Sequence, residues 1–297
     1  MRRSLPPLLT LLLTLFVSRP AAAQNYDTVQ VRTTALGKGV YMLAGAGGNM
    51  GLSVGDDAVF LVDDEFAPLT PKIRAAIAAL TPKPVRFVLN THWHFDHTGG
   101  NKDHGDAGAL LVAHDNVRKR MSTDQFIEAL NRAQPAAEKG ALPVVTFNDT
   151  VTFHINGGDV VAFHVAPAHT DGDAIVVFRG ANVVHMGDVF VSAGFPFVDL
   201  SSGGSIHGVI AACARVLPVL NADTKVIPGH GPLTDRARVQ AYHDMLVVMR
   251  DRMRKEIAAG HTIEQVLASA ITAEYDKSWP GGRERFLRIL FQELSRK

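Results

Sequence analysis

Three histidines and one aspartate crowd into six consecutive residues, at His92, His94, Asp96 and His97. Burying such side chains together is costly unless a cation compensates for the water they lose. In an extended or turning backbone, residues two apart point the same way, so His92, His94 and Asp96 face one side. His97 falls outside this alternation and would therefore bind a metal at a neighbouring position. The motif therefore suggests two metal positions. Imidazole nitrogen and carboxylate oxygen suit zinc, with iron or manganese as other possible occupants.

Each further candidate ligand follows an expected strand, just as this motif follows the continuous apolar stretch 85–89. The three are His169 after strand 159–165, Asp188 after strand 182–186, and His230 after strand 225–227. All three stand beside glycine or in a turn. Loops that follow rigid strands commonly carry chemistry. The sequence therefore predicts a site assembled at one edge of a sheet.

This arrangement resembles the metallo-β-lactamase superfamily of dinuclear metallohydrolases, over most of residues 28–231. The motif H-x-H-x-D-H, followed by single His, Asp and His residues, is highly specific for that family. The resemblance implies an α/β fold, a four-layer αβ/βα sandwich of two mixed sheets with helices outside. It also implies ligands for two metals: His92, His94 and His169 for the first, Asp96, His97 and His230 for the second, and Asp188 as a carboxylate shared by both.

A pair of divalent cations at this site would perform hydrolysis. Two such ions about 3.5–4 Å apart share a hydroxide and polarise a carbonyl. The shared water loses its proton near neutral pH, and the ions stabilise the oxyanion that forms, so no serine or cysteine nucleophile is required. Asp96 is the expected catalytic residue, because it is placed to orient the hydroxide and carry a proton to the leaving group. We expect two Zn²⁺ per chain and a small-molecule substrate with an amide, ester or thioester carbonyl.

The first interpretation of the substrate is a β-lactam. β-Lactams act in the periplasm, and the pattern of residues 1–23, described below, predicts export. Efficient β-lactamases of the family usually have a metal-binding cysteine where this chain has Asp188, or no shared carboxylate. The cysteine-containing group often has a lysine three residues later, which contacts the substrate carboxylate, and Val191 stands there in this chain. These departures predict modest β-lactam hydrolysis with a high KM.

Two other functions stay open. A lactonase or thioesterase of the hydroxyacylglutathione-hydrolase type has the same seven-ligand set, although a glutathione-dependent enzyme would normally stay in the cytoplasm. A mononuclear iron dioxygenase on the same fold needs two histidines and one aspartate. His97 and His230 argue for a second metal and so against the dioxygenase.

The first 23 residues have the pattern of a secretory signal peptide. A basic start is followed by an apolar stretch of about ten residues and by Ala21-Ala22-Ala23, which predicts cleavage after Ala23. The apolar stretch is too short to span a membrane as a helix. We expect a periplasmic or secreted protein with no membrane segment after cleavage. Its single cysteine, Cys213, excludes a disulfide scaffold.

Strand and helix patterns divide the rest of the chain. Residues 24–232 are expected to form the metallo-β-lactamase-like domain, with strands alternating with helices, among them a first strand at 29–33 and a helix at 206–219. Residues 233–297 are expected to form a helical extension packed on it, with helices at 234–258, 262–270 and 283–294. Residues 122–148 are the least patterned and suggest an inserted lid or helix. Without the signal peptide, 27 basic residues face 29 acidic ones. This near-neutral body offers nucleic acid no basic surface.

Several loops are candidates for the pocket. Residues 45–50 are glycine-rich and suggest either a substrate-covering loop or a plain turn. Residues 195–199 could supply an apolar wall. Ser205 is expected to cap the next helix, whose N-terminus could also hold an anionic group. His185 is expected to support the site rather than bind metal. The other histidines and Cys213, in its Ala/Val/Leu-rich helix, are expected to be structural.

Overall fold

The computed structural model describes residues 25–296. The expected signal peptide lies outside the described residues, so export stays a prediction. Within residues 25–296, no helix is both long enough and apolar enough to cross a membrane.

The first sheet contains seven strands in the order β1-β2-β3-β4-β5-β6-β9. They are β1 (Arg32–Gly37), β2 (Val40–Ala44), β3 (Met50–Val54), β4 (Val59–Val62), β5 (Val85–Leu89), β6 (Leu110–His114) and β9 (Val145–Phe147). Strands β1 to β4 run antiparallel, and β4, β5, β6 and β9 run parallel. The sheet is therefore mixed, as expected.

The second sheet contains five strands in chain order. They are β10 (Thr150–Ile155), β11 (Gly158–His164), β12 (Ala174–Phe178), β13 (Val183–His185) and β14 (Lys225–Ile227). Neighbours pair antiparallel except β13 and β14, which are parallel. Strands β11, β13 and β14 consequently end at the same edge of the sheet, and each precedes a candidate ligand.

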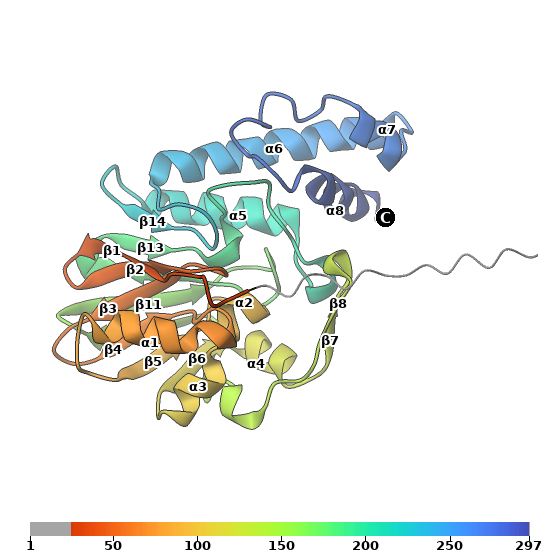
Figure 1. Cartoon of the computed structure of the whole chain (residues 1–297). Helices are drawn as coiled ribbons and strands as arrows, with labels where there is room; N and C mark the ends of the chain where they lie inside the picture. Colours follow the sequence, from red (N-terminus) through yellow and green to blue (C-terminus); the bar gives the residue numbers. More distant parts are fainter. Residues whose placement is uncertain (1–24, 297) are drawn as a thin grey trace, which may run out of the picture.

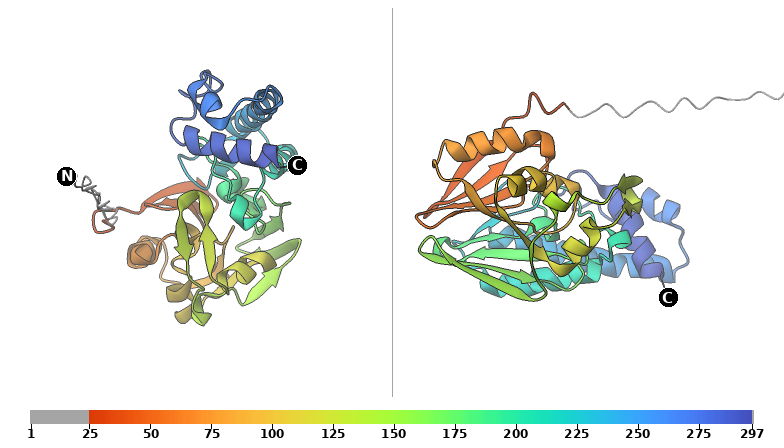
Figure 2. Two further views of the ribbon diagram at one scale, coloured as in Figure 1. Left: turned by 90° about the vertical axis from the view of Figure 1, so that its right-hand side faces the viewer. Right: turned by 90° about the horizontal axis from the view of Figure 1, so that it is seen from below.

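Helices cover the outer faces of both sheets. They are α1 (Thr70–Ala78), α2 (Phe95–Thr98), α3 (Asn101–Asp106), α4 (Asp115–Met121), α5 (Ile206–Val216), α6 (Arg236–Ala258), α7 (Ile263–Ala268) and α8 (Arg283–Ser295). Figure 1 shows α5 and α6 above the second sheet, while α1 lies on the first. The right-hand view of Figure 2 shows the four layers in order: α1, the two sheets, and the α5–α8 helices. The expected α/β sandwich with C-terminal helices is confirmed.

Three apolar clusters correspond to the three spaces between these layers. The middle cluster joins the sheets, with Phe60 and Val62 of β4 packed among residues such as Val176 of β12. A second cluster places Ile73 and Ile77 of α1 on the first sheet. The largest cluster lies between the second sheet and helices α5, α6 and α8. Burial of apolar surface on both faces of each sheet thus fixes the sandwich.

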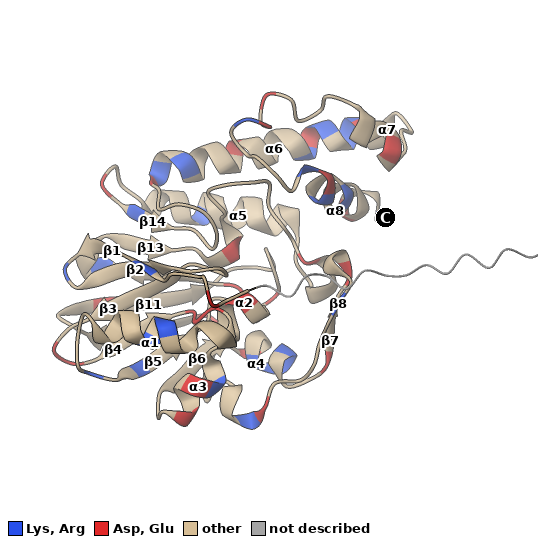
Figure 3. Ribbon diagram, viewed as in Figure 1, with Lys and Arg blue, Asp and Glu red and all other residues tan. Residues whose placement is uncertain are grey.

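The C-terminal helices are tied to the sandwich by polar contacts as well. The Glu293 carboxylate of α8 accepts hydrogen bonds from the Ser205 hydroxyl and the Ile206 amide, both at 2.7 Å. Ser205 also caps α5, as expected. The anionic group anticipated at this helix N-terminus is therefore the chain's own Glu293. Charges of both signs alternate along α6 and α8 (Figure 3).

The structure differs from the sequence-based expectations at three places. The first strand begins at Arg32 rather than near residue 29, because Val29 and Val31 pack beside α1 instead. The helix expected over 206–219 ends at Val216 and continues as a 3₁₀ turn that contains Pro218, which has no N–H to donate.

Of the two forms expected for residues 122–148, an inserted lid or a helix, the α-helix is not what the structure has there. The segment makes a small hairpin of β7 (Gln125–Ile127) and β8 (Arg132–Gln134), followed by the edge strand β9. Between β7 and β8, Asn131 takes a left-handed conformation at φ 48°, which asparagine tolerates in turns. Figure 1 shows this hairpin rising along the right-hand side of the molecule toward α8.

The packing of α6 can be tested with a cavity mutation. Leu246 is fully buried in the largest cluster, so Leu246→Ala should lower the free energy of unfolding by about 2–5 kcal/mol. Lys255→Ala, on the exposed face of the same helix, is the control and should change it by less than about 0.5 kcal/mol. Chemical denaturation of both proteins measures the difference. Equal midpoints would mean that α6 does not belong to the cooperative unit.

Candidate metal centre

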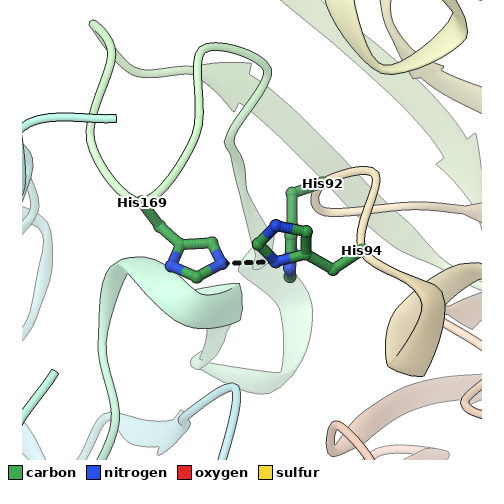
Figure 4. Close-up of side chains that lie close together, drawn as sticks. All are labelled: His92, His94 and His169. Carbon is green, nitrogen blue, oxygen red and sulfur yellow. Dashed lines mark hydrogen bonds between the residues drawn. The ribbon is translucent and has the colours of Figure 1, made fainter. Parts of the chain in front are cut away.

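Three histidines from two loops form the first group of the site. His92 and His94 lie after β5, and His169 lies after β11. One ring nitrogen of each lies within 4.8 Å of the others. The Nδ1 atom of His94 is 2.9 Å from Nε2 of His169, and Figure 4 shows the three rings turned toward one another. This is the set expected for the first metal.

Asp96, His97 and His230 form the second group. Asp96 and His97 lie on the short helix α2, and His230 lies after β14. The Nε2 atom of His230 is 3.3 Å from Oδ2 of Asp96 and 3.4 Å from Nε2 of His97. The displacement of His97 from the His92–His94 side, predicted from residue parity, therefore places it in a neighbouring group.

Asp188 lies between the two groups. Its Oδ1 atom is 3.2 Å from Nε2 of His97. Its Oδ2 atom is 3.4 Å from Nε2 of His230 and 3.6 Å from Nε2 of His169. One carboxylate thus contacts histidines of both groups, which is the position that a shared ligand requires.

Two histidines of the first group, His92 and His169, have the protonation state that metal ligands need. The Nε2 atom of His92 is buried and has no hydrogen-bond partner among the described residues. Burial lowers the pKa of His92 well below its usual value and that of His169 to about 4. Neutral imidazoles that aim their lone pairs at one point suit a bound cation, because the cation supplies the missing partner.

The second group has the opposite electrostatic character. Burial alone would lower the pKa of His230, but the carboxylate of Asp188 raises it to about 10. Burial would raise the pKa of Asp96, but His97 and His230 lower it to about 2. Two carboxylates and two histidines therefore neutralise one another in the protein alone. A cation would replace the histidine protons in this cluster.

Buried carboxylates behind the site orient its histidines. Asp63 accepts a hydrogen bond from Nδ1 of His97 at 2.8 Å and others from the amide and hydroxyl of Thr91. Asp199 accepts one from Nε2 of His94 at 3.1 Å. The Nδ1 atom of His169 donates to the carbonyl oxygen of Phe197 at 2.8 Å. Each ring is held so that its other nitrogen faces the centre of its group.

The glycine-rich loop 45–49 packs against the second group from outside. Gly47 and Ala46 donate backbone hydrogen bonds to the buried Glu65 carboxylate at 3.0 and 3.1 Å. A side chain at Gly48 would collide with the His97 ring, so glycine is required there. None of the described residues of this loop lines the metal-side pocket defined below. The loop therefore helps to position His97.

A pocket of about 270 Å³ opens onto the two groups, and we call it the metal-side pocket. Its floor includes His94, Asp96, Asp188 and His230. Its walls are mostly apolar and come from Phe95, Leu130, Val191, Ala193, Phe195 and Phe197, with Arg285 of α8 as a cationic member. The apolar wall expected from residues 195–199 is present. Val191 faces the pocket, as the resemblance implied for that position.

The structure thus brings all seven predicted ligands together, and their assignment as ligands stays a prediction. His185 supports the site, as expected: it bonds to the backbone oxygen of Asn49 at 2.9 Å. Cys213 is buried, which raises the pKa of its thiol to about 12 and excludes it as a nucleophile.

Sequence reasoning missed three supporting carboxylates, Asp63, Glu65 and Asp199. A signal for the first two was the run of three acids directly after the apolar strand β4, which is an expensive place for charge. Asp63 and Glu65 also adopt left-handed φ values of 60° and 56°, which non-glycine residues keep only where the surroundings impose them. Asp199 stood in the segment expected to form an apolar wall.

Two face-to-face mixed sheets with a histidine–aspartate site at one edge define an α/β metallohydrolase. A sequence model of the metallo-β-lactamase superfamily matches residues 44–238. The chain belongs to the metallo-β-lactamase superfamily and is a metal-dependent hydrolase.

Curated relatives match part of the chain. A hydroxyacylglutathione hydrolase of Polaromonas sp. (strain JS666) is 29% identical over 174 residues, or 58% of each chain. One from Anaeromyxobacter dehalogenans is 28% identical over 60% of this chain and 59% of its own. The chain therefore spans somewhat more than half the length of these two relatives. A probable metallo-hydrolase of Bacillus subtilis, YqgX, is 27% identical over 60% of this chain and 86% of its own.

Solved structures share the fold. The DIM-1 metallo-β-lactamase superposes with a TM-score of 0.59 at 17% identity, covering 73% of this chain and 98% of its own. A metallo-β-lactamase from Pontibacter korlensis gives a TM-score of 0.58 at 18% identity, with 73% and 99% covered. At such identities the likeness establishes the architecture.

The role of Asp199 can be tested by metal affinity. Asp199→Asn removes the charge that orients His94, so we expect a 10- to 100-fold loss of affinity for Zn²⁺, measured by competition with a chromophoric chelator. Asp244→Asn is a matched control, because that exposed carboxylate lies 2.9 Å from Nδ1 of His243, away from the site. Equal affinities in the two variants would show that Asp199 does not support the metal site.

Proposed function

We propose that the protein is an exported hydrolase that holds two Zn²⁺ ions and cleaves an amide or ester carbonyl, with modest activity on β-lactams. The observation that carries this proposal is the position of Asp188 between two groups of ligands. When bound, a zinc pair supplies an acidic water and polarises a carbonyl. The nitrogen and oxygen donors favour zinc. Export rests on the pattern of residues 1–23 alone.

The residues of the pocket divide the remaining work. Asp96 reaches the metal-side pocket, and its Oδ2 atom is the place to hold a proton and pass it to the leaving group. His230, 3.3 Å away, keeps this carboxylate ionised. The aromatic walls from Phe95 and Phe197 exclude water from the carbonyl, which strengthens the electrostatic contacts there.

A lactonase or thioesterase is the second candidate. Two relatives are named hydroxyacylglutathione hydrolases, and Asp188 completes the ligand set that this chain shares with that group by resemblance. An oxygen-dependent enzyme with one iron is less well supported. The candidate ligands form three overlapping groups, which is more than a single two-histidine, one-aspartate iron site needs.

The proton role of Asp96 predicts a large loss of activity on substitution. Asp96→Asn should lower turnover by about 10²–10⁴-fold without unfolding the protein, because the amide cannot accept a proton. Zinc-loaded protein is assayed on β-lactams, lactones and thioesters, and metal is counted by mass spectrometry. Asp103→Asn, an exposed acid on α3, should retain wild-type rates. Wild-type turnover by Asp96→Asn would contradict the assignment, and one iron per purified wild-type chain would favour oxygen chemistry.

The neutral residue at Val191 predicts weak β-lactam binding. Val191→Lys should lower the KM for penicillins or carbapenems by about ten- to a hundredfold, the effect of one charge-assisted contact of roughly 1.5–3 kcal/mol. The KM for neutral esters should fall by less. Steady-state kinetics on matched charged and neutral substrates measure the difference. A micromolar KM for β-lactams in the wild type would contradict this prediction, and turnover of thioesters alone would favour the second candidate.

A further inference from the structure

A second pocket lies beside the metal-side pocket, on the other side of Phe197. It has a volume of about 450 Å³ and lies between α8, the hairpin β7–β8 and the segment 198–201. Its apolar lining includes Ala129, Val198, Leu200 and Ile289, and its charged members besides Arg285 are Glu128, Asp199, Glu284 and Arg288. We call it the outer pocket. It is larger than the metal-side pocket and shares no metal-ligand candidate with it.

Arg285 of α8 lines both pockets. Its guanidinium carbon lies 5.1 Å from the centre of the Phe197 ring, and that ring lies 5.9 Å from His94 and 5.6 Å from His169. One aromatic ring therefore separates Arg285 from the first group of histidines. Arg285 stands at the junction of the two pockets and lines the metal-side pocket together with Val191.

Arg285 also has unused capacity for an anion. Among residues 25–296, the guanidinium of Arg285 makes no ion pair and no hydrogen bond. Arg288, one turn later on the same helix, is paired instead, with Glu284 at 3.0 Å and Glu264 at 3.5 Å. An unpaired guanidinium at the mouth of a mostly apolar pocket is well suited to a carboxylate, because both of its donor edges are available.

We propose that the two pockets form one binding groove for extended anionic substrates, in which Arg285 contacts a carboxylate remote from the scissile carbonyl and the outer pocket holds an apolar substituent beside it. This inference rests on the hydrolase function proposed above and specifies its substrate class. A β-lactam fits the groove poorly, because its carboxylate is close to the lactam carbonyl. A longer ester or thioester with an apolar amino-acid-like end fits it well.

Three matched thioesters distinguish the effect of the substrate carboxylate from the effect of the apolar side chain next to it. They are N-(3-acetylthiopropanoyl)phenylalanine, its primary amide, and the corresponding glycine derivative with its carboxylate. The wild type should prefer the phenylalanine carboxylate over both others in kcat/KM. Arg285→Gln should remove the preference for carboxylate over amide, by about tenfold and mainly through KM, and should leave the amide within about twofold. Arg285→Lys should restore part of the preference, since it restores the charge without the planar fork.

Two further variants locate the effect. Arg179→Gln, a control at an exposed arginine that lies 3.6 Å from Asp159 and lines neither pocket, should keep the carboxylate preference within about twofold. Ala129→Trp should fill the outer pocket and lower kcat/KM for the phenylalanine probe by tenfold or more, while sparing the glycine probe. An unchanged carboxylate preference in Arg285→Gln, or an equal loss for both tails in Ala129→Trp, would overturn the proposal.

A direct binding measurement separates this inference from the hydrolase proposal. The thioether N-(3-ethylthiopropanoyl)phenylalanine lacks the scissile thioester, and its affinity for the zinc-loaded protein is measured by calorimetry once mass spectrometry has shown that its amide stays intact. It should bind the wild type at least about tenfold more tightly than it binds Arg285→Gln, and the difference should shrink in 1 M salt. If no thioester is hydrolysed but this difference is found, the hydrolase proposal fails and the groove stands. If thioesters are hydrolysed and both proteins bind the thioether equally, the groove fails alone.

Discussion

The carboxylate of Asp188 is the group on which the whole site depends. It is nearly buried and lies within reach of His97, His169 and His230, which come from three different segments of the chain. An isolated buried carboxylate would be strongly unfavourable, so its surroundings must supply positive charge. In the protein alone, burial would raise the pKa of Asp188, but the charges of His230 and His97 lower it well below its usual value. A pair of cations satisfies the same requirement.

The backbone around Asp188 is shaped by that requirement. Gly229 donates hydrogen bonds to the carbonyl oxygens of Gly187 and Phe190 at 2.8 and 2.9 Å, which holds the β14 loop against the β13 turn. A Cβ at Gly229 would collide with the Asp188 carboxylate. Gly187 has a φ of 51° and faces Thr91, so a larger residue there would be both strained and crowded. Small residues thus allow two strand ends to approach closely enough for one carboxylate to reach both groups.

Much of this centre could be predicted from local sequence. The parity of His92, His94 and His97 predicted two groups, and strand-then-ligand spacing predicted a common sheet edge, because both depend on neighbouring residues alone. The carboxylates that orient the histidines could not be predicted in this way. Asp199 reaches His94 across 105 residues of chain, and Asp63 reaches His97 across 34. Such contacts follow from how the two sheets pack, which no short pattern records. The hairpin at 125–134 was missed for another reason: its strands have three residues each, too few to show alternation.

The candidate metal ligands and the outer pocket also lie on different parts of the fold. The candidate ligands follow buried strands of the two sheets, whose positions are fixed by apolar packing on both faces. The outer pocket is instead formed by the hairpin and by α8, which lie outside the sheets and meet near Phe197. Changes in those two segments alter the surface that a substrate meets without moving a strand end. In the proposed groove, substrate preference depends on α8, because this helix brings Arg285 to the pocket that Val191 also lines, while the candidate ligands stay at the strand ends.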